Sequence, residues 1–184
     1  MVLERKIAFV HLGDGSVEIR PVPLDLRRTF LGGRGINMHF LSKASSSRLD
    51  PFSPDNPLIF GTGLLSGTLG FGSRIHISTK SPESGHLGDS SMGGDFGAEL
   101  VKAGFSHLVI TGRSDSPVYL FVRDGNVEIR DGRKLKGLET VQTQRKIREQ
   151  LGDKEVKIAC IGLAGENLVV HLLLAETCTD IPRW

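Results

Sequence analysis

One short pattern occurs twice in this chain, and it constrains the fold more than any other feature of the sequence. Residues 14–20 read DGSVEIR and residues 124–130 read DGNVEIR. Each Asp-Gly pair lies between runs in which apolar and polar residues alternate, which is the strongest short-range signal of a β-hairpin. The sequence therefore predicts two antiparallel hairpins of closely similar sequence in separate parts of the chain.

The same order of elements follows each of the two patterns. Helical periodicity covers residues 24–31 and 36–43 after the first pattern, and residues 138–151 after the second. An apolar strand that ends in Gly-Leu then follows, at residues 58–64 and again at residues 156–163. The repeated order of hairpin, helix and strand favours a common origin of the two stretches.

We interpret this order as an ancient duplication within one domain. Residues of about 5–64 form one predicted half and residues of about 115–170 the other, within a single domain that spans residues 1–184. The alternative is a chance likeness of two hairpins. Because strands outnumber helices, the predicted class is α+β, with duplicated β-rich halves and mostly antiparallel sheets.

The segment between the two halves is rich in glycine. Ten of the 23 glycines lie between Gly61 and Gly97, and glycine here indicates positive φ angles or a backbone that another group approaches closely. The residues predict in order a strand, a turn, a strand, a loop, a short helix and a strand, at 74–80, 81–85, 86–90, 91–94, 95–103 and 108–111. Gly104 follows the predicted helix in the usual place of a C-cap.

Charge and hydropathy exclude several classes of protein. The 23 basic and 21 acidic residues give a formal net charge of +2, which argues against a nucleic-acid-binding protein with a broad basic surface. No apolar run reaches the roughly 18 residues needed to cross a bilayer. The first ten residues include Glu4, Arg5 and Lys6 rather than an apolar leader. We therefore expect a cytoplasmic protein without a membrane or nucleic-acid partner.

The side chains that usually bind metals are scattered through the sequence. Cys160 and Cys178 form no C-x-x-C motif and are too few for a zinc site or an iron–sulfur cluster. Both are expected to be reduced, structural thiols. The six histidines include no pair with the i, i+4 spacing of a helical metal site, and no G-x-S-x-G motif occurs. The residues alone predict no self-contained catalytic site.

A candidate anion site lies in the glycine-rich segment. Residues 91–94 read SMGG and lead into the predicted helix, where free backbone N–H groups and the helix dipole suit a phosphate. Arg74 begins a strand after several glycines and is placed to bind a phosphate through its guanidinium. Taken singly, these features also fit a plain turn and a solvated strand end. The run GGRG at residues 32–35 indicates either a helix break or close packing of backbone against a ligand.

Several further motifs occur in order along residues 5–170. They read FLGGRG, GTGLLSG, TKSP, GGDFGAEL and IGLAGEN, at residues 30–35, 61–67, 79–82, 93–100 and 161–167. Together with Arg74 and the run KAG at residues 102–104, this combination resembles the N-terminal domain of the tungsten-containing aldehyde ferredoxin oxidoreductase family. Because several separate motifs match with few gaps, the resemblance is specific.

The resemblance implies a fold, an activity and a set of cofactors. The family domain is a duplicated α+β unit that forms a base beneath the cofactor. Enzymes of the family oxidise aldehydes with water to carboxylic acids and pass electrons through a 4Fe–4S cluster to ferredoxin. Their tungsten, or more rarely molybdenum, is held by the dithiolenes of two pterins of the molybdopterin type, whose phosphates are bridged by magnesium. The resemblance thus implies a tungsten bis-pterin and magnesium here, with the iron–sulfur cluster only in C-terminal domains.

Individual site residues follow from the same resemblance. Arg74 matches a residue that contacts a pterin phosphate, and the backbone of Ser91, Met92, Gly93 and Gly94 matches a loop that holds pterin phosphate. The main-chain carbonyl of Ser91 is expected to help bind the bridging magnesium. Better-known members carry Asn in place of Ser91, a change that keeps a main-chain ligand but not a side-chain contact. No catalytic residue is implied.

Two departures from the family pattern concern the end of the sequence. Residues 175–184 do not match the second phosphate loop of the family, which puts a second pterin site in doubt, and the helical domains with the cluster cysteines and substrate channel are missing. The chain is therefore expected to be a truncated fragment that is inactive alone. Its expected partners are those domains or a subunit carrying them, and ferredoxin for the complete enzyme. An exposed cofactor face would also favour a homo-oligomer.

Three functions stay open from the sequence. The first is the cofactor-binding domain of an aldehyde:ferredoxin oxidoreductase. The second is a stand-alone module that carries a metal pterin, and the third is a degenerate remnant whose glycine loops are only turns. The aldehyde is not encoded in these residues, because the family's channel lies beyond Trp184. The choice of tungsten or molybdenum is not encoded either, because the pterins supply the sulfur ligands.

Overall fold

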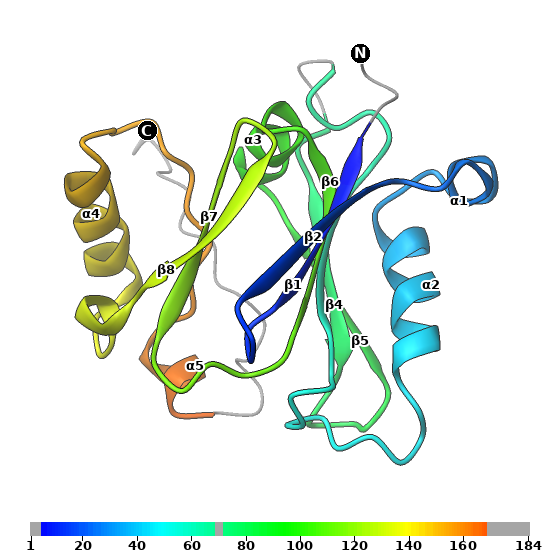
Figure 1. Ribbon diagram of the computed structural model, residues 1–184, viewed down its shortest axis with the longest axis horizontal. Coiled ribbons are helices and arrows are strands. Elements are labelled where there is room, and N and C mark those ends of the chain that lie inside the picture. The colour runs from blue at the N-terminus through cyan, green and yellow to red at the C-terminus, as the bar shows by residue number, and fades with distance from the viewer. Residues whose placement is uncertain (1–4, 69–71, 169–184) are drawn as a thin grey trace.

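Figure 1 shows the computed structural model, in which residues 5–68 and 72–168 are described. A six-stranded sheet stands at its centre, with α1 and α2 against one face and α3 against the other. The two-stranded sheet β7–β8 faces the same side as α3, and α4 lies beyond it. The central strands are β1 (Lys6–His11), β2 (Ser16–Pro21), β3 (Leu58–Thr62), β4 (Ile75–Lys80), β5 (Leu87–Met92) and β6 (Phe105–Thr111).

The remaining elements complete the two outer layers. The second sheet consists of β7 (Val118–Arg123) and β8 (Asn126–Asp131). The helices are α1 (Leu24–Thr29), α2 (Arg34–Ala44), α3 (Phe96–Lys102), α4 (Thr140–Leu151) and α5 (Leu163–Glu166), with a 3₁₀ turn at Arg133–Leu135. No helix among the described residues is long and apolar enough to cross a membrane.

The strand order of the central sheet is β2-β1-β6-β3-β4-β5. Strands β1 and β6 pair in parallel, and every other described pairing in the two sheets is antiparallel. The predicted α+β class with mostly antiparallel sheets is therefore confirmed. Both predicted hairpins form, as β1–β2 and as β7–β8.

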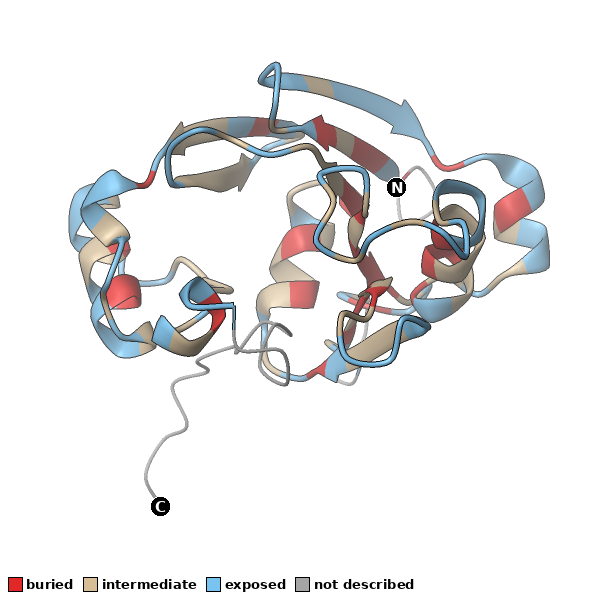
Figure 2. Ribbon diagram, turned by 90° about the horizontal axis from the view of Figure 1, so that it is seen from below, coloured by how far each residue is buried: buried red, intermediate tan, exposed pale blue. Residues whose placement is uncertain are grey.

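The two faces of the central sheet have different chemistry because side chains alternate along each strand. Ile75 and Ile77 of β4 point to the α3 side, into a core that also holds Phe105 and Leu100. A second apolar core packs α1 and α2 on the opposite face and includes Ile59 of β3. Figure 2 shows the buried residues concentrated along the central strands and on the inward sides of the helices.

The predicted helices form close to their expected bounds. Helix α4 begins with a capping box, in which the backbone N–H of Glu139 is bonded by the side chain of Gln142. It ends at Gly152, whose φ of 67° is the left-handed conformation of a C-cap. The glycines at residues 32–33 divide the first helical stretch into α1 and α2, as the sequence predicts.

Two predicted elements differ in the structure. Residues 156–161 form no named strand, although they are mostly half-buried and line a cleft; their apolar pattern reflects that burial rather than pairing with a described strand. Ser91 and Met92 belong to β5 rather than to a loop, so the turn before α3 begins at Gly93.

Some predictions concern residues that the structure does not describe. The tail at residues 175–184, including Cys178, lies outside the described residues, and so do His171 and residues 169–170. The duplication stays a prediction.

Candidate functional site

The glycine-rich motifs meet at one end of the central sheet, here called the glycine edge (residues 32–35, 61–67, 74 and 91–94). Strands β3 and β5 end there and β4 begins there. Residues Gly32 and Gly63 form an isolated antiparallel bridge, in which Gly33 N–H donates to the Thr62 carbonyl at 2.8 Å. Motifs that lie far apart in sequence therefore form one continuous rim.

Two glycines of this rim are required by close backbone packing. Gly32 has a φ of 98°, and a Cβ there would lie 2.8 Å from the Thr62 carbonyl oxygen. At Gly61 a Cβ would lie 2.1 Å from Oδ1 of Asn37. A side chain at Gly32 would collide with the backbone of residues 62–64, and one at Gly61 would displace the Asn37 side chain. The GGRG run thus reflects both a helix break and close backbone packing.

Residues 91–94 supply mainly backbone groups. The side chain of Met92 is buried in the α3-side core, at 5% exposure, so this residue can offer a ligand only its main chain. A side chain at Gly93 would meet open space, and Gly94 has a φ of 85°. The N–H groups of Gly93 and Gly94 donate to no acceptor in the described residues. Because α3 has only seven residues, the contribution of a helix dipole is small, and the predicted anion site depends on the exposed turn.

Arg74 lies beside this turn. It precedes β4, and the pairing of Ile75 with Met92 brings it next to Gly93. The Arg74 side chain is exposed and forms no ion pair or hydrogen bond with the described residues. The neighbouring carboxylate of Asp95 is directed to Lys157, with Oδ2 3.6 Å from Nζ. The Arg74 guanidinium is therefore available to an external anion.

A polar cluster that the sequence did not reveal lies on the α2 face of the same edge. Asp89 Oδ2 accepts from Arg34 at 2.6 Å, and Asp89 Oδ1 accepts from the Ser78 hydroxyl at 2.9 Å. The Asn37 amide donates to Ser78 Oγ at 3.0 Å, and His76 Nδ1 lies 3.5 Å from Asp89 Oδ2. Cross-strand register brings His76, Ser78 and Asp89 together, and the packing of α2 on the sheet adds Arg34 and Asn37. The polar alternation at positions 76 and 78 is the one sequence signal for them.

Two buried basic residues support the rim from beneath. Arg5 donates to the carbonyls of Gly63 and Ser66 at 2.7 and 2.8 Å, which fixes the loop after β3. Burial without a counter-ion lowers the pKa of the Arg5 guanidinium. Burial also lowers the pKa of His107 to about 4, so this imidazole is neutral at pH 7. Its Nδ1 lies 2.8 Å from the Ser106 hydroxyl.

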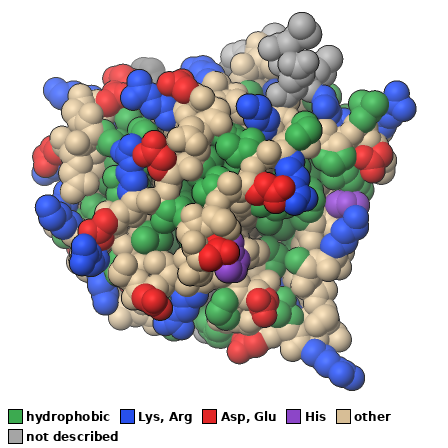
Figure 3. Space-filling view, in the orientation of Figure 1, with side chains coloured by type: hydrophobic (Ala, Val, Ile, Leu, Met, Phe, Trp, Pro, Cys, Tyr) green, Lys and Arg blue, Asp and Glu red, His purple; other side chains and the backbone are tan. Residues whose placement is uncertain are grey.

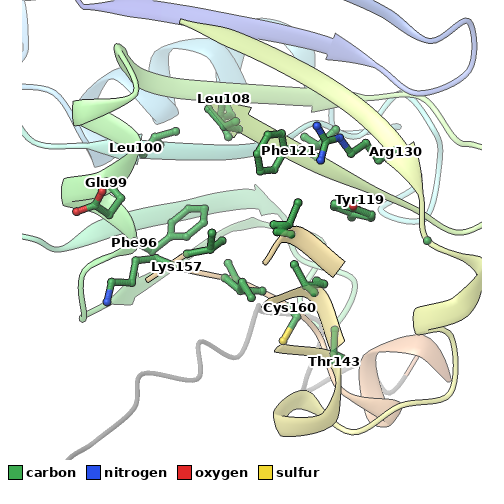
Figure 4. A pocket seen from close by; sticks show the side chains of 18 of the residues that line it. Phe96, Glu99, Leu100, Leu108, Tyr119, Phe121, Arg130, Thr143, Lys157 and Cys160 are labelled. Carbon is green, nitrogen blue, oxygen red and sulfur yellow. The ribbon is translucent and has the colours of Figure 1, made fainter. Parts of the chain in front are cut away.

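A large cleft lies elsewhere, between the α3 face of the sheet and the β7–β8 hairpin. Its volume is about 1040 Å³, and Figure 4 shows Phe96, Leu100 and Leu108 on one side of it with Tyr119 and Phe121 nearby. Hydrophobic side chains are visible across this region in the space-filling view of Figure 3, with charged side chains around the margin. None of the predicted site residues lines this cleft.

The described residues contain no group of three or more His, Cys, Asp or Glu side chains that could hold a metal ion. Cys160 is half-buried, and its thiol donates to the Thr140 carbonyl at 3.9 Å.

Comparison with known proteins gives a consistent result. The family model of the aldehyde ferredoxin oxidoreductase N-terminal domain matches residues 7–179. A tungsten-containing aldehyde ferredoxin oxidoreductase of Pyrococcus horikoshii is 44% identical over 165 residues, which cover 89% of this chain and 27% of the relative. An aliphatic sulfonate oxidoreductase, WOR-like subunit, of Pyrococcus furiosus is 32% identical, with 89% and 28% coverage.

A solved structure shows the same fold. The active-site complex BamBC of benzoyl coenzyme A reductase, in complex with 1,5-dienoyl-CoA, contains a chain that matches with a TM-score of 0.88 and 36% identity. The match covers 92% of this chain and 26% of that one. The chain thus spans about a quarter of the length of its relatives. It belongs to the tungsten-containing aldehyde ferredoxin oxidoreductase family, in which it corresponds to the N-terminal domain.

Proposed function

We propose that this chain holds the phosphate end of a tungsten-bearing pterin in an oxidoreductase of its family. In this proposal the Arg74 guanidinium binds one phosphate, and the backbone of Ser91, Met92, Gly93 and Gly94 surrounds it. The main-chain carbonyl of Ser91 binds a magnesium ion that bridges pterin phosphates. The single observation that carries the proposal is the Arg74 guanidinium, which has no partner among residues 5–68 and 72–168, beside an open glycine turn.

The residues present fit such a group. The edge offers donors without protein acceptors, at Gly93 and Gly94, and one unpaired cation, at Arg74. No side chain fills the space over Gly93. The two carboxylates at or beside the edge have cationic partners, Asp95 with Lys157 and Asp89 with Arg34, which reduces their repulsion toward an anion. This donor set suits a phosphate ester and lacks the side-chain ligands that would bind a metal directly.

The reaction is proposed for a longer assembly, because the chain spans about a quarter of its relatives. When bound, the metal pterin supplies the redox centre. The overall reaction would convert an aldehyde and water to a carboxylic acid, protons and an electron pair, with a 4Fe–4S cluster of other domains and ferredoxin as the acceptor. This chain would contribute binding and orientation of the cofactor, not proton transfer, and activity of the chain alone is not expected.

The named substrates of the relatives differ, although they share this domain. The relatives include an aldehyde ferredoxin oxidoreductase, an aliphatic sulfonate oxidoreductase and a benzoyl coenzyme A reductase complex. The domain therefore serves several chemistries, and substrate choice would reside in the other domains. We favour the aldehyde because the curated aldehyde enzymes share the higher identity, 44% against 32%.

The test is a metal and pterin assay on the 184-residue chain, purified anaerobically from a host supplied with tungstate. Tungsten is measured by mass spectrometry and pterin by fluorescence after oxidation. We expect both in the native chain and much less of both in Arg74→Ala, while Arg28→Ala, an exposed arginine on α1, keeps the native amounts. Absence of tungsten and pterin from the native chain would overturn cofactor binding by this chain.

A further inference from the structure

The structure points to one more ligand contact at the glycine edge, and this inference rests on the proposed function. We propose that His76 binds a phosphate oxygen of the cofactor through its Nε2 atom. His76 is not among the residues implied by the family resemblance. Its position follows from strand register and from the polar cluster around Asp89.

Register places His76 next to both predicted phosphate contacts. His76 of β4 pairs directly with Ser91 of β5, so their side chains lie on the same face of the sheet, about 5 Å apart at Cβ. Arg74 precedes His76 by two residues and lies on that face by strand alternation, roughly 6.5 Å along the strand. A phosphate or diphosphate group between Arg74 and Ser91 is within reach of the imidazole.

The Asp89 carboxylate faces one nitrogen of the ring. His76 Nδ1 is buried and lies 3.5 Å from Asp89 Oδ2. Asp89 is itself held by Arg34 at 2.6 Å and by the Ser78 hydroxyl at 2.9 Å, with only 13% of its side chain exposed. Nδ1 is therefore the ring nitrogen that faces the fixed carboxylate, at a distance longer than an ordinary hydrogen bond.

The other ring nitrogen is left open. Nε2 of His76 has no partner in the described residues and is not among the buried unpaired atoms, whereas Nδ1 is. The side chain is 26% exposed. The Cδ2 edge of the ring, next to Nε2, faces Gly33, where a Cβ would approach to 3.1 Å. Glycine at position 33 therefore keeps the open edge of the ring clear.

The chemistry of this arrangement favours an anion. An imidazole ring with Nδ1 toward Asp89 and an N–H at Nε2 offers that N–H to a phosphate oxygen as a hydrogen-bond donor. The Arg34 guanidinium, paired with Asp89, is the neighbouring cation on α2. The imidazole would supply a polar side-chain contact that the short Ser91 hydroxyl does not reach.

The test uses pyrophosphate with Mg²⁺ as the probe and the 184-residue chain as the protein. Affinity is measured by calorimetry for the native chain, His76→Asn, His76→Gln and Arg74→Ala, and thermal melts confirm folding of each. The amide of Asn replaces Nδ1 of histidine and the amide of Gln replaces Nε2. We expect His76→Asn to weaken binding about tenfold and His76→Gln to stay within about threefold of native. His86→Asn, an exposed histidine at the other end of the β4–β5 hairpin, is the matched control and should bind like native.

Each other result is decisive. If Arg74→Ala loses binding and His76→Asn does not, the His76 contact is wrong and the phosphate site stands. If His76→Asn and His76→Gln weaken binding equally, the residue acts through the fold around Asp89 and contacts no phosphate at Nε2. If the native chain does not bind pyrophosphate, the phosphate site of the proposed function fails together with this inference.

Discussion

The two hairpins of this protein have nearly the same sequence and the same pairing, yet they have different roles. In β1–β2, Phe9 pairs with Glu18 and Val10 with Val17. In β7–β8, Phe121 pairs with Glu128 and Val122 with Val127. The first hairpin is joined to the central sheet through the β1–β6 pairing, whereas the second forms a separate sheet over the cleft. Local sequence therefore determines that each hairpin forms, and contacts with the rest of the chain determine which sheet it belongs to.

The turns of the hairpins differ although both contain Asp-Gly. In the second hairpin Arg123 pairs with Asn126, so Asp124 and Gly125 alone form the turn, with φ angles of 48° and 80°. In the first hairpin His11 pairs with Ser16, which leaves a loop of four residues. The shorter turn has the positive φ values of a type I′ turn. The duplication predicted from these hairpins remains a prediction.

The largest expected effect is on the free energy of unfolding, and it differs between the central sheet and the second hairpin. Phe105 of β6 is fully buried in the core between them, so Phe105→Ala should lower the free energy of unfolding by about 3–5 kcal/mol. Val127→Ala on β8 removes fewer buried atoms from the same core and should cost about 2 kcal/mol. Urea denaturation measures both, with the exposed Val141→Ala as control. A loss below 1 kcal/mol for Phe105→Ala would contradict this account of the core.

Acid should lower the free energy of unfolding through the central sheet, because the buried His107 lies in its strand β6. Burial lowers the pKa of His107 from 6.5 to about 4, so between these pH values the unfolded chain binds a proton that the folded chain does not. Stability is therefore complete above pH 6.5 and is lost as the pH falls toward 4, by about 3 kcal/mol.

Urea denaturation at pH 7, 5.5 and 4.5 checks this dependence. His107→Gln should remove most of the loss between pH 7 and 4.5, whereas the exposed His86→Gln should keep it. Residues 112–168, which include the second hairpin, contain no histidine. Equal pH slopes for the native chain and His107→Gln would show that His107 does not carry the effect.

The sequence predicted those features whose signal is local. The Asp-Gly turns, the C-cap at Gly152 and the break at residues 32–33 each need only neighbouring residues, and all are present. The predicted strand at 156–163 failed because an apolar pattern shows burial but not a pairing partner. At the site, the sequence placed Arg74 and Gly93 together through the family resemblance, and the register agrees.

The features that the sequence did not reveal depend on long-range contacts. Arg34 and Asp89 are 55 residues apart, and the pair forms only because α2 packs over β3 and β4, the strand that pairs with β5. Lys80 is similar: its buried ammonium donates to the carbonyls of Ser46, Ser47 and Leu49, which anchors the loop before β3. A lysine on a strand gives no sign of such a role in the sequence, because most lysines are exposed.

The turn glycines allow a finer comparison of the hairpins. Gly15 and Gly125 both have positive φ, 72° and 80°, so alanine at either should cost about 1 kcal/mol of the free energy of unfolding. Gly125→Ala should cost more, since this residue is in the two-residue turn and its N–H donates to the Ala103 carbonyl at 2.8 Å. Gly125→Asn, which tolerates positive φ, should recover part of the loss. Equal losses for Gly15→Ala and Gly125→Ala would show that the turn length has no energetic consequence.

The smallest expected effect concerns one arginine on each hairpin. Arg130 lies 3.8 Å from the centroid of the Phe121 ring, whereas the equivalent Arg20 lies 5.2 Å from that of Phe9. Both arginines also pair with a glutamate two residues earlier. Because the closer cation–π contact is the stronger one, Arg130→Gln should lower Tm by roughly 1–3 °C and Arg20→Gln by less. Calorimetric melts at low and high salt separate the ring contact from the screened ion pair. If the difference between the two variants disappears at high salt, the glutamate pairs rather than the rings distinguish the hairpins.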